Sequence, residues 1–183
     1  TDLREVPSVV AGDKASRHSI ILAKSIPAKK YGIQTGEPLF QALEKCPELV
    51  VIPPDYDLYV QASRHFVDML RQFSPAVEQY SIDEAWVDMT GTQRLWGTPR
   101  LAAELMRRRI NEELGFTVNI GISSNKLLAK MAGDFEKPNK VHTLFPEEMG
   151  EKFFPLPVRD LFLVGAATER KLQRLGIYTI GAL

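Results

Sequence analysis

The amino-acid sequence predicts an α+β fold, in which helices cover one face of a largely antiparallel sheet. Apolar residues recur at helical spacing over residues 55–73 and again over 98–114. Short runs between and after these segments read as strands, so the middle of the chain follows the order helix, hairpin, helix, strand, helix, strand. That order is typical of a layer of helices packed on a sheet.

The composition is that of a globular protein. The chain has 183 residues, of which 44% are hydrophobic and 25% are charged, enough for one good core or two small lobes. It contains no apolar run of the ~20 residues that span a bilayer, and its polar start does not read as a signal peptide. The single cysteine, Cys46, excludes an internal disulfide and fits a reducing compartment. We therefore expect a cytoplasmic protein without a membrane partner.

The balance of charge gives no signal for nucleic-acid binding by itself. Basic and acidic residues number 23 each, so the formal net charge is zero. The distribution is uneven, because residues 55–120 hold 7 basic and 10 acidic residues and residues 151–183 hold 5 and 3. The middle of the chain is therefore acidic and the tail mildly basic.

Short elements are expected before residue 55. Residues 6–11 and 19–23 read as two strands joined by a polar turn at 12–18. Pro27 is placed to open a short helix that Gly32 ends, and Pro38 to open another. Residues 50–52 read as a short buried strand.

Two long helices follow, separated by a hairpin and a loop at 91–97. Asp55 is expected to cap the first, and Thr98 with Pro99 to start the second, which Gly115 ends. The positions expected to face the core are Leu58, Ala62, Phe66, Met69, Leu70 and Phe73 in the first helix and Leu101, Ala102, Leu105, Met106 and Ile110 in the second. Strands at 118–122 and 140–144 flank a further helix at 124–134.

Asp83 and Glu84 interrupt the hairpin. Neighbouring residues of a strand face opposite sides, so two adjacent acids require a turn, or a metal that both reach from an irregular backbone. Carboxylate oxygens suit Mg²⁺, which takes one or two carboxylates together with substrate phosphates. Spacing alone favours the simpler interpretation, a hairpin tip with two solvated acids.

The tail, from residue 161, reads as helix–hairpin–helix, with a helix at 169–175. The N–H groups of Val164 and Gly165, at the start of that helix, are candidates for binding a DNA phosphate without reading sequence. A plain helical hairpin is the alternative.

Five segments together resemble one family. Residues 80–88 read YSIDEAWVD and residues 121–139 read GISSNKLLAKMAGDFEKPN. Both resemble palm segments of the Y-family (translesion) DNA polymerases, in particular the bacterial DinB or polymerase IV-like class. Residues 30–38 resemble its fingers, residues 46–56 the entry to its palm, and the tail its helix–hairpin–helix thumb. The order and spacing of the five segments agree across nearly the whole chain.

The resemblance implies template-directed nucleotidyl transfer with two Mg²⁺ ions. Asp83 and Glu84 match two of the family's three catalytic, metal-binding carboxylates: Asp83 would bridge both ions, and Glu84 would hold the ion that activates the primer 3′ hydroxyl. Lys137 matches the lysine that contacts the triphosphate of the incoming dNTP. Asp134 matches its usual neighbour, although a helix-end role is the alternative.

The sequence departs from the family at two places. The family's opening strand carries a third metal-binding Asp, and this chain begins after it, so the resemblance implies a fragment, or a truncated relative, that is inactive by itself. In the fingers, residues 25–29 (SIPAK) stand where the family has a Ser-Tyr-Glu-Ala-Arg-type run. Ile26 cannot donate a hydrogen bond, and Lys29 keeps a charge without the bidentate fork of Arg. Binding of the dNTP triphosphate is therefore expected to be weaker, or to be shared by Lys29 with Lys24 and Lys30. The alternative is that Lys29 and Lys30 are ordinary exposed helix residues.

The resemblance divides the chain into a fingers-like subdomain (1–54), a palm (55–144) and a partial thumb (145–183). The partners it implies are primer–template DNA, a dNTP and, through a C-terminal segment absent from this chain, a sliding clamp. Two other functions stay open. One is a non-catalytic DNA-binding or partner-binding module of the same fold. The other is a palm-type nucleotidyl cyclase, against which the tail argues.

Overall fold

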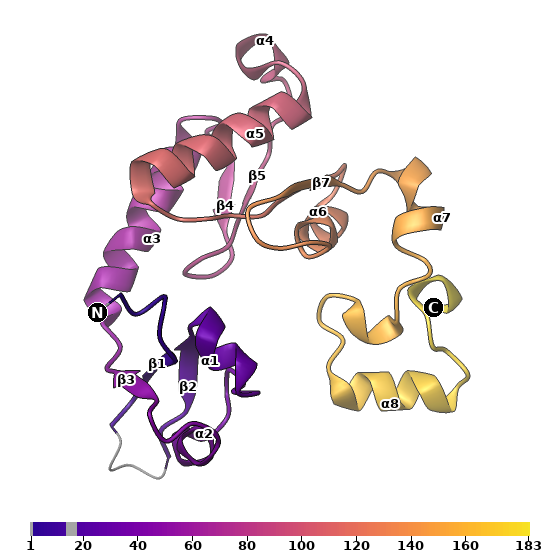
Figure 1. Cartoon of the computed structure of the whole chain (residues 1–183). Helices are drawn as coiled ribbons and strands as arrows, with labels where there is room; N and C mark the ends of the chain where they lie inside the picture. Colours follow the sequence, from indigo (N-terminus) through magenta and orange to yellow (C-terminus); the bar gives the residue numbers. More distant parts are fainter. Residues whose placement is uncertain (1, 14–17) are drawn as a thin grey trace. The chain divides into compact units, whose positions relative to one another are not determined.

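The computed structural model describes residues 2–13 and 18–183, which form two compact units, Thr1–Tyr59 and Val60–Leu183 (Figure 1). Both units combine helices with short strands, which confirms the predicted α+β class. The two strands predicted at the start of the chain are both present. The middle of the turn between them, residues 14–17, lies outside the described residues.

The first unit is built on a three-stranded sheet of order β2-β1-β3. Strand β1 (Ser8–Ala11) pairs antiparallel with β2 (Ile21–Lys24) and parallel with β3 (Val50–Ile52). Helices α1 (Ile26–Lys30) and α2 (Leu39–Lys45) lie where the two prolines predict them.

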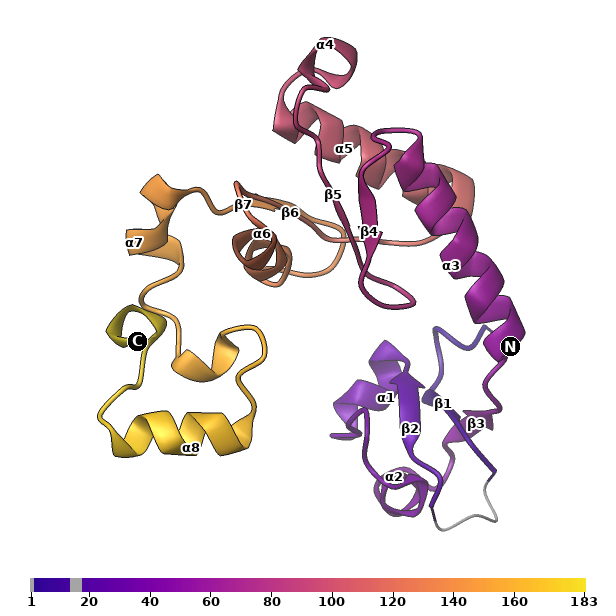
Figure 2. The same cartoon turned by 180° about the vertical axis from the view of Figure 1, so that it is seen from behind.

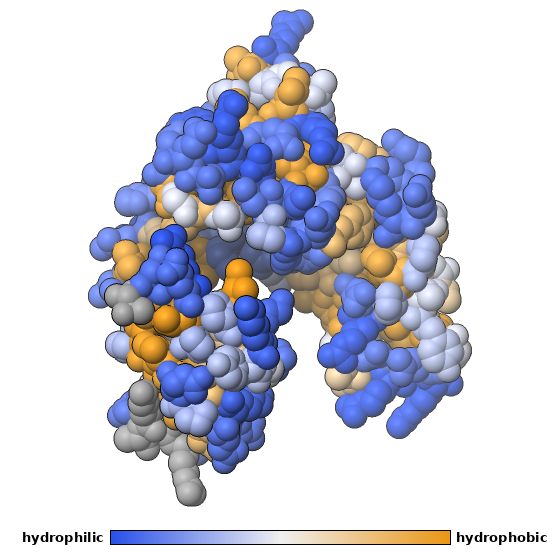
Figure 3. Space-filling model, in the orientation of Figure 1, coloured by the Kyte–Doolittle hydropathy of each residue, from blue (hydrophilic) through white to orange (hydrophobic). Residues whose placement is uncertain are grey.

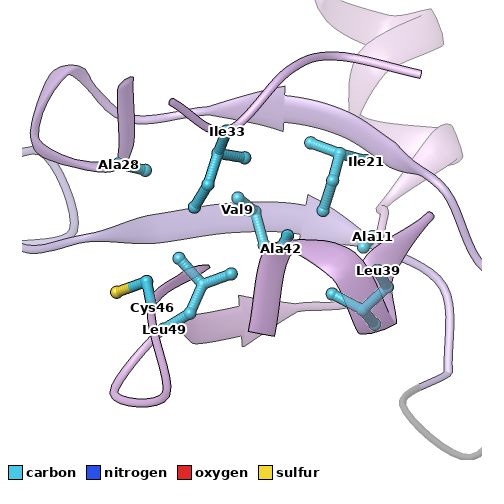
Figure 4. Close-up of a cluster of buried hydrophobic side chains, with 9 residues drawn as sticks. All are labelled: Val9, Ala11, Ile21, Ala28, Ile33, Leu39, Ala42, Cys46 and Leu49. Carbon is cyan, nitrogen blue, oxygen red and sulfur yellow. The ribbon is translucent and has the colours of Figure 1, made fainter. Parts of the chain in front are cut away.

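A single apolar cluster holds this unit together (Figure 4). It contains Val9, Ala11, Ile21, Ala28, Ile33, Leu39, Ala42, Cys46 and Leu49, all buried. Burial raises the pKa of the Cys46 thiol, so this cysteine packs as a small apolar residue. The expectation that residues 50–52 are buried is wrong for Val50, which is 40% exposed, because β3 is an edge strand paired on one side only.

Ser25 fastens α1 to the sheet. Its hydroxyl accepts hydrogen bonds from the N–H of Ala28 (3.2 Å) and the N–H of Ser8 (3.0 Å) and donates one to the carbonyl of Val6 (2.8 Å). The first of these is an N-cap, and it explains why α1 begins at this serine.

The second unit holds two separate two-stranded sheets (Figures 1 and 2). Strands β4 (Val77–Gln79) and β5 (Ala85–Val87) form the predicted antiparallel hairpin. Strands β6 (Ile120–Ile122) and β7 (Val141–Thr143) are parallel, because helix α6 (Lys126–Gly133) connects them as a crossover.

Long helices α3 (Tyr56–Arg71) and α5 (Pro99–Arg109) cover the β4–β5 hairpin. Asp55 caps α3, and Thr98 caps α5, as predicted. The predicted loop at 91–97 instead contains a short helix, α4 (Gln93–Trp96). Beyond α5 the chain continues as a π-helical turn, Ile110–Leu114, to Gly115 in the left-handed conformation.

The core beneath these helices consists of Met69, Leu70, Phe73, Met106 and Ile110, all among the predicted inner positions. Two other predicted positions are wrong, because Leu58 is 56% and Leu101 62% exposed. Each lies in the first turn of its helix. The predicted helical period is therefore right, but the first apolar residue of each helix lies before the segment that packs against the core.

After β7 the chain contains α7 (Met149–Lys152), α8 (Ala166–Arg174) and three 3₁₀ turns, Pro146–Glu148, Val158–Asp160 and Ile180–Ala182. Helix α8 starts three residues before the predicted position, since Gly165 is its N-cap. Hydrophilic side chains cover the side of α8 seen in Figure 3. Among the helices of the described ranges, none has the length and apolarity needed to cross a bilayer.

Candidate catalytic site

The turn between β4 and β5 presents two carboxylates. The N–H groups of Tyr80 and Ser81 both donate to the carbonyl of Glu84, at 2.9 and 3.2 Å, and close the turn. Asp83 is exposed, and its carboxylate accepts a hydrogen bond from the Ser81 hydroxyl at 2.8 Å. The turn that two adjacent acids require is therefore present, and one acid points to solvent with a single hydroxyl partner.

Helix α6 brings the basic side of the site against this turn. The helix sits very close to β6, because a Cβ on Gly121 would lie 1.9 Å from the carbonyl oxygen of Ala129. Asn125 caps the helix by accepting from the N–H of Leu128 at 2.9 Å. The glycine permits the close approach and the cap fixes the start of the helix, so the two together set where its later residues lie.

Four charged side chains of alternating sign form a chain of ion pairs. The Lys130 ammonium lies 2.7 Å from a Glu84 carboxylate oxygen and 3.0 Å from one of Asp134. The other Asp134 oxygen lies 2.8 Å from the ammonium of Lys137. The predicted site residues Glu84 and Lys137 are therefore linked through two residues of α6 and its C-cap.

Burial and pairing act in opposite directions on the two middle groups. Burial disfavours the charged form of Lys130, but hydrogen bonds to Glu84 and Asp134 outweigh it and raise the lysine's pKa. Burial likewise disfavours the Asp134 carboxylate, but hydrogen bonds from Lys137 and Lys130 outweigh it and lower the pKa of Asp134. Both groups are therefore held in their charged forms.

Aromatic side chains pack around Lys130 and the hairpin. The Lys130 ammonium lies 5.8 Å from the ring centre of Phe162, and the Tyr80 ring packs edge-on against both Phe162 and Trp86, with centroids 5.7 and 5.0 Å apart. Trp86 donates its indole N–H to the carbonyl of Lys126 at 3.1 Å. These contacts fix the hairpin to α6 and leave the Lys130 side chain only 20% exposed.

The donor set suits Mg²⁺ as part of a site. Asp83 and Glu84 supply hard oxygen ligands, which match an ion that takes one or two carboxylates and completes its shell with water and phosphates. Within residues 2–13 and 18–183 no three acidic, histidine or cysteine side chains group closely enough to hold a metal. Asp83 and Glu84 would be the two carboxylates offered to such an ion, and Glu84 would have to exchange Lys130 for it.

The other predicted site residues are not members of this ion-pair chain. Lys29 is exposed on α1 in the first unit, and no described side chain pairs with its ammonium. Lys24, predicted to assist it, donates instead to the Ile33 carbonyl at 2.7 Å and so supports its own loop. Of the two predicted phosphate contacts, the Val164 N–H donates to the Leu161 carbonyl at 2.9 Å, and Gly165 is the N-cap of α8.

Lys130 is the residue that the sequence analysis missed. Its spacing of four residues before Asp134 signals a helical ion pair. The sequence contains no signal for its pairing with Glu84, because that contact joins residues 46 positions apart.

A concave region of about 450 Å³ lies apart from these residues. Its lining comes from α5, the loop between α6 and β7, β7 and α7, and two of its cations are paired with acids: Arg107 with Glu104, and Lys140 with Glu136. Asp83, Glu84 and Lys137 do not line it. The carboxylate turn is therefore the candidate site.

Solved structures of DinB and Dbh DNA polymerase have the same fold as this chain. The chain superposes on the crystal structure of DinB from Sulfolobus solfataricus with a TM-score of 0.83 and 27% identity, over 96% of this chain and 52% of that one. It matches an insertion ternary complex of Dbh DNA polymerase with a TM-score of 0.85 and 26% identity, over 96% and 52% of the two chains.

The chain belongs to the impB/mucB/samB family, whose model matches residues 1–134. It is 51% identical over 182 residues to DNA polymerase IV of Clostridium acetobutylicum, a match that covers 100% of this chain and 46% of the relative. DNA polymerase IV of Moorella thermoacetica is 46% identical over 182 residues, covering 99% and 46%. The predicted resemblance is thus confirmed, and the chain spans about half the length of the curated relatives it matches.

Proposed function

We propose that this chain supplies the fingers (1–54), palm (55–144) and first part of the thumb (145–183) of a lesion-bypass, DNA-directed DNA polymerase. The observation that carries the proposal is the ion-pair chain, which joins the acidic turn at Glu84 to Lys137. A cation-binding carboxylate pair next to a phosphate-binding lysine is the arrangement that nucleotidyl transfer requires. Family membership and the polymerases among its relatives support the same function.

Each site residue has a role in this proposal. Asp83 and Glu84 would hold the Mg²⁺ ions, and the exposed carboxylate of Asp83 is open to an ion from solvent. When bound there, the ions would supply activation of the primer 3′ hydroxyl and neutralisation of the leaving pyrophosphate. Lys137, with its side chain 61% exposed, binds the dNTP triphosphate, and Lys29 adds a second, less constrained positive charge.

The tail supplies a sequence-independent grip on primer–template DNA. Helix α8 begins at Gly165 without a side-chain cap, so the amide groups of its first turn are available for a phosphate oxygen. The helix carries Arg170, Lys171 and Arg174, all exposed. We expect this binding to weaken steeply with salt, as backbone contacts do. A sliding clamp and a cytoplasmic location complete the proposal.

Primer extension tests the chemistry. In a chimera, this chain replaces the matching 182 residues of the Clostridium acetobutylicum relative, and the rest of that protein is kept. We expect Mg²⁺-dependent extension of a primed template, lost on the order of a hundredfold in Asp83→Asn and in Glu84→Gln. Glu112→Gln, which changes an exposed acid of the π-helical turn, is the matched control and keeps the rate.

Binding by the chain itself separates this proposal from the alternatives. A catalytic palm binds Mn²⁺ through Asp83 and Glu84, and a non-catalytic module of the same fold binds DNA without a metal that these two residues control. A folded chimera that binds primed template but never extends it would overturn the polymerase function. Cyclic nucleotide formation from a triphosphate without DNA would favour the cyclase instead.

A further inference from the structure

Lys130 lies at the centre of a network of ion pairs that reaches both ends of the site. Lys130 has two carboxylate partners, at 2.7 Å on Glu84 and at 3.0 Å on Asp134. Asp134 in turn has two ammonium partners, since it also holds Lys137 at 2.8 Å. Each inner group therefore divides its charge between two partners, and a stronger bond on one side weakens the bond on the other.

A divalent cation at Glu84 competes directly with Lys130. The ammonium occupies a carboxylate oxygen that the cation needs, and the two positive charges repel each other at this separation. Lys130 has a second acceptor within reach, because Asp134 lies one helical turn along the same helix. Moving fully onto Asp134 keeps the half-buried ammonium paired, whereas losing both partners would leave it uncompensated beneath Phe162.

The same move changes the hold on Lys137. An Asp134 carboxylate that is fully neutralised by Lys130 attracts Lys137 less. Lys137 is the most exposed of the four side chains, at 61%, so it can leave the ion pair without exposing an apolar surface or burying a charge. Its ammonium then becomes available to an oxyanion in solvent.

We propose that Lys130 is a positioning residue that couples the two halves of the site, releasing Lys137 toward nucleotide phosphates when a divalent cation takes Glu84. This inference rests on the proposed function, because it assumes that Glu84 binds the cation and Lys137 the triphosphate. Coupling is reciprocal, so a triphosphate bound to Lys137 frees Asp134 for Lys130 and thereby favours cation binding at Glu84. The exchange requires no proton transfer and no backbone movement.

Two substitutions on α6 and its C-cap test this exchange in the intact chain. Lys130→Met keeps the length of the side chain and removes its charge. Glu84 then has no competing cation, so Mn²⁺ alone should bind about fivefold more tightly, measured by the loss of the free-ion electron paramagnetic resonance signal. Asp134 holds only Lys137, so dATP in the presence of a chelator should bind about fivefold more weakly, measured by equilibrium dialysis.

Asp134→Asn should give the opposite pattern. Lys130 then pairs with Glu84 alone and opposes Mn²⁺ more strongly, while Lys137 is free and binds dATP without metal more tightly. Lys130→Arg keeps the charge and should leave both affinities within about twofold of the parent chain. Circular dichroism confirms that each variant is folded.

Opposite shifts of the two affinities distinguish coupling from a structural role, since a loosened site weakens both. If Lys130→Met and Asp134→Asn each move both affinities in one direction, or move neither, the coupling is overturned while the proposed function stands. If the parent chain binds no Mn²⁺ that Asp83→Asn can weaken, the proposed function is overturned and the coupling with it.

Discussion

The two units of the chain position their lysines in different ways. In the second unit, Lys137 is tied through Asp134 and Lys130 to the acidic turn, so its place follows from a network of contacts. In the first unit, Lys29 extends from a five-residue helix, and its ammonium has no partner among the described residues. A charge held by paired neighbours carries structural support for its role, whereas the role of Lys29 depends on resemblance alone.

Displacing α6 tests whether its packing on β6 positions the ion-pair network of the second unit. Gly121→Ala places a Cβ 1.9 Å from the Ala129 carbonyl, so the helix has to move away from β6 and take Lys130 with it. We expect a loss of about 3 kcal/mol in the free energy of unfolding, measured by urea titration of tryptophan fluorescence. Both tryptophans, Trp86 and Trp96, lie in the second unit.

Gly133→Ala is the matched control. It lies at the end of the same helix, but its Cβ would meet its nearest neighbour at 3.5 Å, an ordinary contact. Alanine also favours the helical conformation more than glycine does, so stability should stay equal or rise by about 0.5 kcal/mol. Equal losses in the two variants would show that the close packing of α6 on β6 does not fix the site.

A second substitution destabilises the first unit alone. Ser25→Ala removes the three hydrogen bonds that join α1 to β1 and the preceding residues. We expect about 2 kcal/mol of destabilisation, because the N–H groups of Ser8 and Ala28 lose their partner. The reactivity of Cys46 measures this destabilisation, because Cys46 is the only cysteine of the chain and is buried. Its thiol should react faster with a disulfide reagent in the variant.

Tryptophan fluorescence supplies the control for that experiment, since it follows the second unit. The urea midpoint seen by Trp86 and Trp96 should stay unchanged in Ser25→Ala. A shared shift of the thiol and tryptophan signals would mean that the two units unfold as one cooperative body, and would contradict the division of the chain.

Sequence patterns succeeded where local rules decide the structure. The turn at Asp83 and Glu84, the caps at Asp55 and Thr98, and the core position of Phe73 all follow from neighbours within a few residues. Patterns failed at positions that distant packing decides. The helical period of α5 does not reveal that Leu101 lies outside the buried part of the helix. The contact between Lys130 and Glu84 forms only when the chain folds, because the two residues are far apart in the sequence.

The third prediction compares the two lysines directly. Lys137→Gln should weaken binding of dATP in the presence of Mn²⁺ about tenfold, and Lys29→Gln about threefold, measured by calorimetry on the intact chain. The reason is preorganisation: Asp134 holds the ammonium of Lys137 at 2.8 Å, whereas Lys29 gives up more side-chain freedom on binding. A larger effect at Lys29 would reverse the assignment and make the first unit the main triphosphate contact.

The smallest expected effect concerns Glu148, in the segment after β7, and the stability of the fold at acidic pH. Hydrogen bonds from Lys152, the Phe145 N–H and the Thr143 hydroxyl lower the pKa of Glu148 from its usual 4.5 to about 2. A lowered folded-state pKa means that this carboxylate stabilises the fold above about pH 4.5 and that the contribution is lost as the pH falls from there toward 2.

Glu148→Gln tests that sign. The variant should unfold at a lower urea concentration than the parent chain at pH 7, and the difference should shrink at pH 3, where part of the parent's stabilisation has gone. The difference should be modest, because the carboxylate and its lysine partner both reach solvent and such pairs are screened. Glu147→Gln, at the exposed neighbouring position, should show no such narrowing. A gap between Glu148→Gln and the parent that widens toward pH 3 would mean that Glu148 is held protonated in the fold, the reverse of what its three donors indicate.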